Sequence, residues 1–129
     1  MQRLVSAYSL EDHVVVKKWI AGQEKEDVLN RTLINILPSY NEGLPMTILE
    51  TLARGIPNIS TNIAAIPEVI EEGENGILIE PGDIGKLSRE IQRLTMDMTL
   101  CDQLSNGAIK TIHSDFLLDQ TIEKLKTIY

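Results

Sequence analysis

The sequence predicts an α/β fold: a partial Rossmann-like, doubly wound parallel sheet of about four strands, with helices on both faces and further helices toward the carboxyl end. Three observations predict it. Short apolar runs alternate with stretches of helical spacing along the first two thirds of the chain, which favours parallel strands joined by right-handed crossovers. Gly, Pro and Asn residues separate these stretches. The last third has apolar residues three or four positions apart, as amphipathic helices do.

The predicted elements follow one another closely. Gly55 and Gly73 end two of the helices, and an Asn-Gly pair turns the chain into the last strand. Asp83 and Thr99 are the expected side-chain caps of two of the later helices. In chain order we expect helix 2–8, strand 13–19, helix 23–31, strand 33–37, helix 45–54, strand 56–60, a short helix 67–71, strand 77–79, and helices that begin near 83, 99 and 114.

The segment Leu37–Glu50 is the centre of the functional argument. Here an apolar strand leads through a polar turn into a helix whose predicted first position is Pro45, where the missing N–H would have no helical partner. The backbone amides of Met46 and Thr47 also have no helical partner, and with the positive end of the helix dipole they favour a phosphate. Gly43 lets the backbone come close to such a ligand, because it has no Cβ.

Two carboxylates flank this junction, Glu42 before the helix and Glu50 within it. Because carboxylates repel phosphate, hydroxyl groups are their better partners, and a ligand with hydroxyls on both sides of a phosphate is a nucleotide sugar. We therefore expect the sugar near Glu42 and the ribose near Glu50, whose side chain leans toward the helix start. The plainer alternatives are a loop carboxylate stabilised by the helix dipole and a solvated helix glutamate.

The same segment resembles the signature of family 4 of the retaining glycosyltransferases of GT-B fold, in which two glutamates are separated by seven residues. The resemblance continues through residues 51–57, 59–61 and 66–70, and through Asn75-Gly76 and Pro81-Gly82-Asp83. It implies a catalytic contact of Glu42 near the reacting sugar carbon, and it implies no obligatory metal and no other cofactor. The donor-binding residues that it implies are Glu42, Gly43, Leu44, Met46, Thr47 and Glu50.

Polar residues that follow two of the predicted strands face the same rim of the sheet. Ser39 and Tyr40 come after one strand, and Thr61 and Asn62 come after the next. These four residues are candidate rim contacts for a ligand. The alternative is an ordinary pair of loops, because loops use the same residue types without binding anything.

Two departures from the family pattern bear on this site. Lys18 stands where family members tend to have glycine before the tryptophan. The tryptophan itself, Trp19, is more expected to pack in the protein than to stack on a nucleotide base. The stretch 63–66 (Ile-Ala-Ala-Ile) stands where the family commonly has one or two glycines, and the added methyl groups restrict its backbone. If glycines there allow a substrate to approach, acceptor or sugar binding is affected. If they serve only a turn, it is not.

Composition and charge narrow the class of protein. A chain of 129 residues, 43% hydrophobic and 24% charged, is an ordinary globular domain by size and content. Its net charge of −7 argues against nucleic acid as a partner. His13 and His113 have no partners at metal-ligand spacing, so no metal site is expected, and Cys101 is expected in the core. The lone cysteine and the lack of a long apolar run favour a cytoplasmic protein, with membrane association of the complete enzyme left open.

We expect residues 1–129 to form a single domain, the C-terminal portion of a GT-B nucleotide-sugar-binding domain, because the family's first strands, its basic diphosphate-binding residues and its acceptor domain have no counterpart here. The complete enzyme would move a sugar from a UDP- or GDP-linked donor to a glycan or lipid-linked glycan, as in polysaccharide biosynthesis. This fragment alone would be inactive. The alternative is a non-catalytic module that binds nucleotide sugars or proteins. An exposed sheet edge near Val14–Val16 would favour homo-oligomers.

Overall fold

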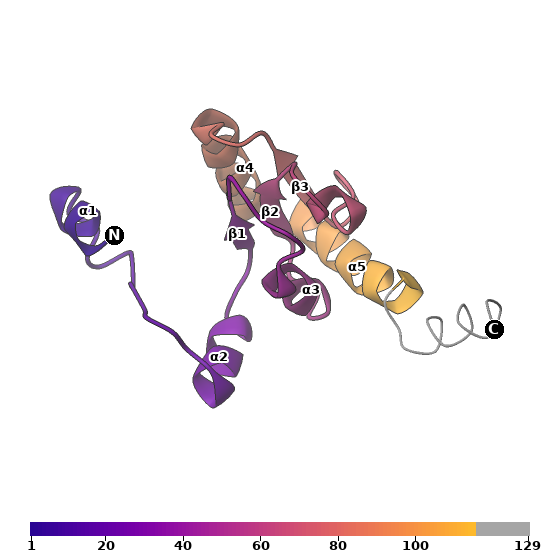
Figure 1. Cartoon of the computed structure of the whole chain (residues 1–129), viewed down its shortest axis with the longest axis horizontal. Helices are drawn as coiled ribbons and strands as arrows, with labels where there is room; N and C mark the ends of the chain where they lie inside the picture. Colours follow the sequence, from indigo (N-terminus) through magenta and orange to yellow (C-terminus); the bar gives the residue numbers. More distant parts are fainter. Residues whose placement is uncertain (116–129) are drawn as a thin grey trace. The chain divides into compact units, whose positions relative to one another are not determined.

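The structure is a computed structural model that describes residues 1–115, so nearly all of the helix predicted from 114 onward lies outside the described residues. The chain divides into two compact units, one from Met1 to Arg31 and one that begins at Thr32. Each unit has its own elements, which Figure 1 labels along the chain.

The first unit contains two helices, α1 (Gln2–Ala7) and α2 (Gly22–Leu29), close to the predicted ranges. The prediction of a strand at 13–19 is wrong, because this segment is a coil that connects the two helices (Figure 1). A β-strand is held by hydrogen bonds to a neighbouring strand, and no strand in the described part of the chain pairs with this segment. Its apolar side chains are therefore exposed, and Trp19, which was expected to pack, is 92% exposed.

The second unit is built on a three-stranded parallel sheet in the order β1 (Asn35–Leu37), β2 (Asn58–Thr61) and β3 (Gly76–Ile79). Ile59 in β2 pairs with a residue of each neighbouring strand, which sets the register. The predicted parallel sheet is confirmed, with three strands in place of about four. All residues of β2 are buried, as expected for the middle strand of a sheet that is covered on both faces.

Helices cover both faces of this sheet, as the sequence predicted (Figure 1). They are α3 (Met46–Leu52), the 3-10 helix η1 (Ile66–Glu68), α4 (Ile84–Met96) and α5 (Met98–Asp115). On one face, α3 and the middle of α5 pack through Ile48 and Ala108. On the other face, α4 and the first part of α5 pack through Leu94 and Leu104 onto Ile59.

Polar side chains inside this unit are paired with one another. Asn75 is fully buried, and its Nδ2 donates to Val69 O and to Thr111 Oγ1, each over 2.9 Å, while its Oδ1 accepts from the backbone N of Glu71 over 2.9 Å. The sequence predicted only an Asn-Gly turn at this point. In the structure the asparagine side chain links the segment after η1 to α5.

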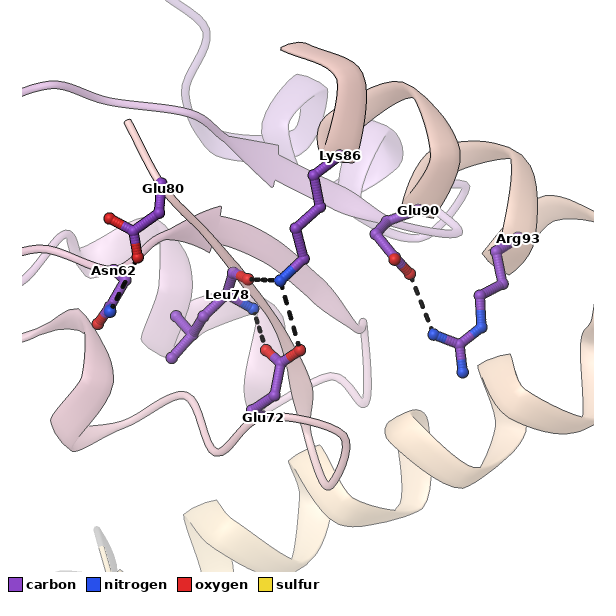
Figure 2. Close-up of polar contacts among 7 residues, drawn as sticks. All are labelled: Asn62, Glu72, Leu78, Glu80, Lys86, Glu90 and Arg93. Atoms are coloured by element: carbon purple, nitrogen blue, oxygen red, sulfur yellow. Dashed lines mark hydrogen bonds and ion pairs between the residues drawn. The ribbon is translucent and has the colours of Figure 1, made fainter. Parts of the chain in front are cut away.

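Side chains also close the outer edge of β3 (Figure 2). The backbone N of Leu78 donates to a carboxylate oxygen of Glu72, and Lys86 Nζ donates to Leu78 O over 2.7 Å. Lys86 and Glu72 also form an ion pair, with 3.8 Å between Nζ and Oε1. An open edge strand offers its N–H and C=O groups to other chains, and these two side chains occupy both groups of Leu78.

The ends of the two long helices show which residues cap them. Asp83 caps α4 as predicted, because its Oδ1 accepts from the backbone N of Lys86 over 2.8 Å. The prediction that Thr99 caps the next helix is wrong. That helix, α5, begins one residue earlier, and Asp97 Oδ1 accepts from the backbone N of Leu100 over 3.0 Å. The cap lies two residues before the predicted one, a difference that sequence patterns seldom resolve.

Cys101 lies in the core with 3% of its surface exposed, as predicted. Burial raises the pKa of its thiol above the ordinary value, and the neighbouring charge of Asp102 raises that pKa further. His13 and His113 are exposed. The thiol therefore acts as a small apolar group that fills space beside Leu104 and its neighbours.

Candidate functional site

The loop between β1 and α3, residues 38–45, follows the carboxyl end of a parallel strand, where α/β sheets bind ligands. Two buried hydroxyls of β2 hold the beginning of this loop. Ser60 Oγ donates to Leu37 O over 2.9 Å, and Thr61 Oγ1 donates to Ser39 O over 2.7 Å. Thr61 was predicted as a rim contact, and the structure places its side chain inside the protein, where it fixes the loop.

Glu42 is half-buried within this loop, and its orientation is set by a neighbour. Ser39 Oγ donates to Glu42 Oε1 over 2.8 Å. The second carboxylate oxygen, Oε2, accepts no hydrogen bond from the residues that the structure describes. One oxygen is thus held while the other can accept a hydroxyl. The sequence placed Ser39 at the rim but did not pair it with Glu42; a serine three residues before an acid is the signal that could have shown it.

Helix α3 begins at Met46, so Pro45 is the residue before the helix and not its first helical residue as predicted. Pro45 has an extended backbone with a ψ of 124°. The first α3 residue with a backbone–backbone hydrogen bond from its N–H is Ile48, which donates to Pro45 O over 3.0 Å. The amides of Met46 and Thr47 precede that bond, and both side chains are exposed. The start of α3 therefore lies at the surface, as the predicted phosphate contact requires.

Glu50 is half-buried and lies one helical turn after Met46 on α3. Helical side chains lean toward the N-terminus, so Glu50 leans toward the same end of α3 as the loop. The two predicted hydroxyl acceptors, Glu42 and Glu50, therefore belong to one loop and the helix that follows it, as the sequence predicted. The opposite side of α3 is anchored by Ile48 and Leu52, both fully buried.

Gly43 and Leu44 form the open part of the loop. A Cβ added to Gly43 would meet no atom within 4 Å, and its φ is not in the left-handed region. Neither the backbone nor the packing of the described residues therefore requires glycine at this position. Leu44 is 38% exposed. This stretch leaves room for a ligand to approach the backbone closely.

Tyr40 lies on the α4 side of the loop and is 76% exposed. Its hydroxyl lies against Gly82, since a Cβ built on Gly82 would be 3.1 Å from that oxygen. A cavity of about 190 Å³ lies beside the ring. The predicted rim residue Asn62 is exposed, and its Nδ2 donates to Glu80 Oε1 over 3.4 Å (Figure 2).

The stretch 63–66, where the family commonly has glycine, is a turn with an unusual backbone. Ala64 has a φ of 49°, in the left-handed region that favours glycine and costs an alanine about 1–2 kcal/mol. Ile66 at the end of the stretch is fully buried. The structure thus shows a backbone reason for glycine at this position.

Among residues 1–115 there is no group of three or more His, Cys, Asp and Glu side chains that could hold a metal ion. The helices within that range are all too short or too polar to cross a bilayer. Arg54, the first cation after the loop in sequence, is exposed and follows α3.

Known proteins are similar to this chain in sequence and in fold. The family model described as "Glycosyl transferases group 1" matches residues 1–111. The chain belongs to this family. It is 28% identical over 128 residues to N-acetyl-alpha-D-glucosaminyl L-malate synthase of Bacillus anthracis, a match that covers 98% of the chain and 33% of that protein.

Two solved structures have the same fold as this group 1 glycosyl transferase chain. Sucrose-phosphate synthase from Thermosynechococcus elongatus is 23% identical with a TM-score of 0.86, over 99% of the chain and 32% of that protein. HepE from Anabaena, solved in complex with UDP-glucose, is 20% identical with a TM-score of 0.83, over 98% of the chain and 35% of that protein. The chain therefore spans about a third of the length of these relatives.

Proposed function

We propose that this chain is the donor-binding part of a retaining glycosyltransferase that transfers a sugar from a nucleotide-diphosphate sugar to a glycan or lipid-linked glycan. Family membership supports sugar transfer as the reaction class. The geometry that carries the proposal is the loop 38–45, which places the ordered carboxylate of Glu42 before the exposed start of α3. UDP and GDP are the two nucleotide classes we consider, and the solved complex of HepE with UDP-glucose makes UDP the first to test.

The diphosphate would lie at the start of α3. The amides of Met46 and Thr47 donate to it, and the helix dipole adds favourable charge as the bond to the sugar breaks. Gly43 leaves its approach open. Because the chain has a net charge of −7 and diphosphate is anionic, basic groups from other parts of the complete enzyme would complete this contact.

The two glutamates would bind the hydroxyls on either side of that diphosphate. Glu42 accepts hydroxyls of the donor sugar and stabilises positive charge as it develops at the anomeric carbon, while Ser39 keeps its carboxylate in place. Glu50 accepts the ribose hydroxyls from its place one turn into α3. No metal or other cofactor is needed for these roles.

The chain would act as the C-terminal portion of a nucleotide-sugar-binding domain within a longer enzyme. The chain's span of about a third of its relatives supports this arrangement. Catalysis between two domains needs both walls of the active site, so the chain alone would bind donor without turnover. We place the complete enzyme in the cytoplasm, with its acceptor reached at the membrane surface.

Calorimetric titration with UDP, GDP, UDP-glucose and GDP-mannose tests the proposal. We expect Glu50→Gln to weaken UDP and UDP-glucose about tenfold and equally, because the ribose is common to both. Glu42→Gln should weaken UDP-glucose about tenfold and leave UDP unchanged. Glu71→Gln, an exposed acid in the β2–β3 connection, is the matched control. A chain that folds and binds none of the four nucleotides contradicts the proposal.

The first unit favours a second role, as a surface for self-association. Its exposed apolar residues include Leu4, Tyr8, Val15 and Trp19, with exposures between 59% and 92%. Large apolar side chains exposed in this number favour contact with another protein surface. The contact would use side chains and not strand pairing, since residues 13–19 form no strand. Light scattering should show oligomers that Val15→Lys and Trp19→Lys dissociate; a monodisperse monomer of the unchanged chain contradicts this role.

A further inference from the structure

The carboxyl edge of the sheet carries a concave feature on the α4 side of the loop that contains Glu42. It is the cavity of about 190 Å³ beside Tyr40. Most of its lining is apolar, and its one acidic lining residue is Asp83. The residues around it are Pro38, Tyr40, Ile79, Gly82, Asp83, Ile84 and Leu87.

Tyr40 forms a wall of this cavity, and its ring is exposed. Three quarters of its surface is open to solvent, yet its hydroxyl lies against Gly82, where a Cβ would be 3.1 Å away. Gly82 also has a φ of 83°, which a residue with a Cβ rarely adopts. The start of the loop behind the ring is fixed by the bond from Thr61 to Ser39 O. An exposed aromatic ring on a fixed backbone is a preorganised surface for stacking.

The chemistry of the lining selects the kind of ligand. Pro38, Ile79 and Leu87 offer an apolar surface, whereas Asp83 offers a carboxylate with one oxygen, Oδ1, already used to cap α4. The second oxygen can accept a hydroxyl hydrogen. A ligand with an apolar face and hydroxyls at its edge matches both features, and a pyranose ring has this form. An anion does not fit, because Asp83 would repel it.

The cavity is separate from the proposed donor contacts. Its residues Ile79 and Leu87 belong to the apolar cluster on the α4 face of the sheet, whereas α3, which carries Glu50, packs on the opposite face. Tyr40 and Glu42 are nevertheless only two residues apart on one loop. A ring bound beside Tyr40 would therefore be near the donor without being the donor's own sugar.

We propose that this cavity binds one neutral sugar ring of the acceptor, stacked on Tyr40 and hydrogen-bonded to Asp83. The inference rests on the proposed function, because it assigns the second substrate of the same reaction. It adds a binding site that the resemblance to the family did not assign, and it explains why the ring of Tyr40 is exposed.

Amide chemical shifts of the isotope-labelled chain test the inference, with methyl α-D-glucopyranoside as the neutral probe and UDP in a separate titration. The sugar should shift the amides of Gly82, Asp83 and Leu87, with weak affinity in the millimolar range. Tyr40→Ala should weaken this binding about tenfold, and Tyr40→Phe should retain it. Met96→Ala, which removes an equally exposed apolar side chain at the end of α4, should change nothing. Glucose 6-phosphate should bind more weakly than the neutral probe.

The outcomes separate the two proposals. If the sugar causes no shifts at roughly 100 mM, or if its shifts persist unchanged in Tyr40→Ala, the inference is overturned, whatever UDP does. If UDP shifts the amides of Met46 and Thr47 while the sugar causes no shifts, the donor site is supported and the sugar site beside Tyr40 is rejected. If the sugar binds beside Tyr40 and UDP binds nowhere, the cavity stands and the donor assignment fails.

Discussion

Two connections begin at the carboxyl ends of neighbouring strands, and they differ in how fully their polar side chains are hydrogen-bonded. The β1–α3 loop (38–45) has its central acid half-buried, bonded to Ser39 on one oxygen only. The β2–β3 connection (62–75) ends with Asn75 fully buried and bonded on both ends of its side chain. In the β1–α3 loop, one oxygen of the Glu42 carboxylate can still accept a hydrogen bond. In the β2–β3 connection, the amide of Asn75 makes its hydrogen bonds inside the protein. We therefore expect the partly bonded carboxylate of Glu42 to serve binding and the fully bonded amide of Asn75 to serve stability.

The packing around the two connections shows the same difference. Ile66, Val69 and Ile70 of the β2–β3 connection are buried in the core against α3 and α5. In the β1–α3 loop Tyr40 and Leu44 are exposed. Substitutions in the first should change stability, and substitutions in the second should change binding.

The largest expected effect is on stability, from Asn75→Ala. Removing the amide leaves the buried Val69 O and the part-buried backbone N of Glu71 without these partners, which costs about 3 kcal/mol of unfolding free energy. Urea unfolding followed by circular dichroism measures it. Asn106→Ala, at an exposed position of α5, is the control and should change stability by less than about 0.5 kcal/mol. If Asn75→Ala were as stable as Asn106→Ala, the buried hydrogen bonds of Asn75 would not be what stabilises the β2–β3 connection.

Ser39→Ala should affect binding more than stability. Without the bond to Oε1, the Glu42 carboxylate is no longer held, and the preference for UDP-glucose over UDP should fall about fivefold to tenfold. Its unfolding free energy should change by less than about 1 kcal/mol, since the bond is only partly buried. Calorimetry with both nucleotides measures the preference, with Ser88→Ala on α4 as the control. A large loss of stability with unchanged preference would make Ser39 a structural residue.

The smallest effect concerns the backbone of the β2–β3 connection. Ala64 has a φ of 49°, so Ala64→Gly removes strain that exceeds the added chain entropy and should stabilise the protein by about 0.5–1 kcal/mol. The neighbouring Ala65, at a φ of −86°, provides the opposite case. Ala65→Gly should destabilise by about 0.5 kcal/mol, because only the entropy changes. Opposite signs in thermal unfolding confirm the backbone explanation, and equal signs contradict it.

Local patterns were enough to predict much of this molecule. The parallel sheet, the helices on both faces and the cap at Asp83 each follow from spacing or residue type within a few positions. The order of Glu42, the helix start and Glu50 also lies within one short segment, so the sequence could place them together. The same segment indicated a glycosyltransferase, and the match over residues 1–111 shows membership of the group 1 glycosyl transferases.

Other features depend on partners that are distant in sequence. A strand at 13–19 could not be decided from its apolar residues, because a strand forms only with a neighbour to pair with. The link from Asn75 to Thr111 spans 36 positions, and the contact of Tyr40 with Gly82 joins loops after two different strands. Residue types within a segment determine helices, turns and caps, since those bonds close over a few residues. Which polar group is enclosed and which faces a ligand depends on how the elements pack, and only the folded chain contains that information.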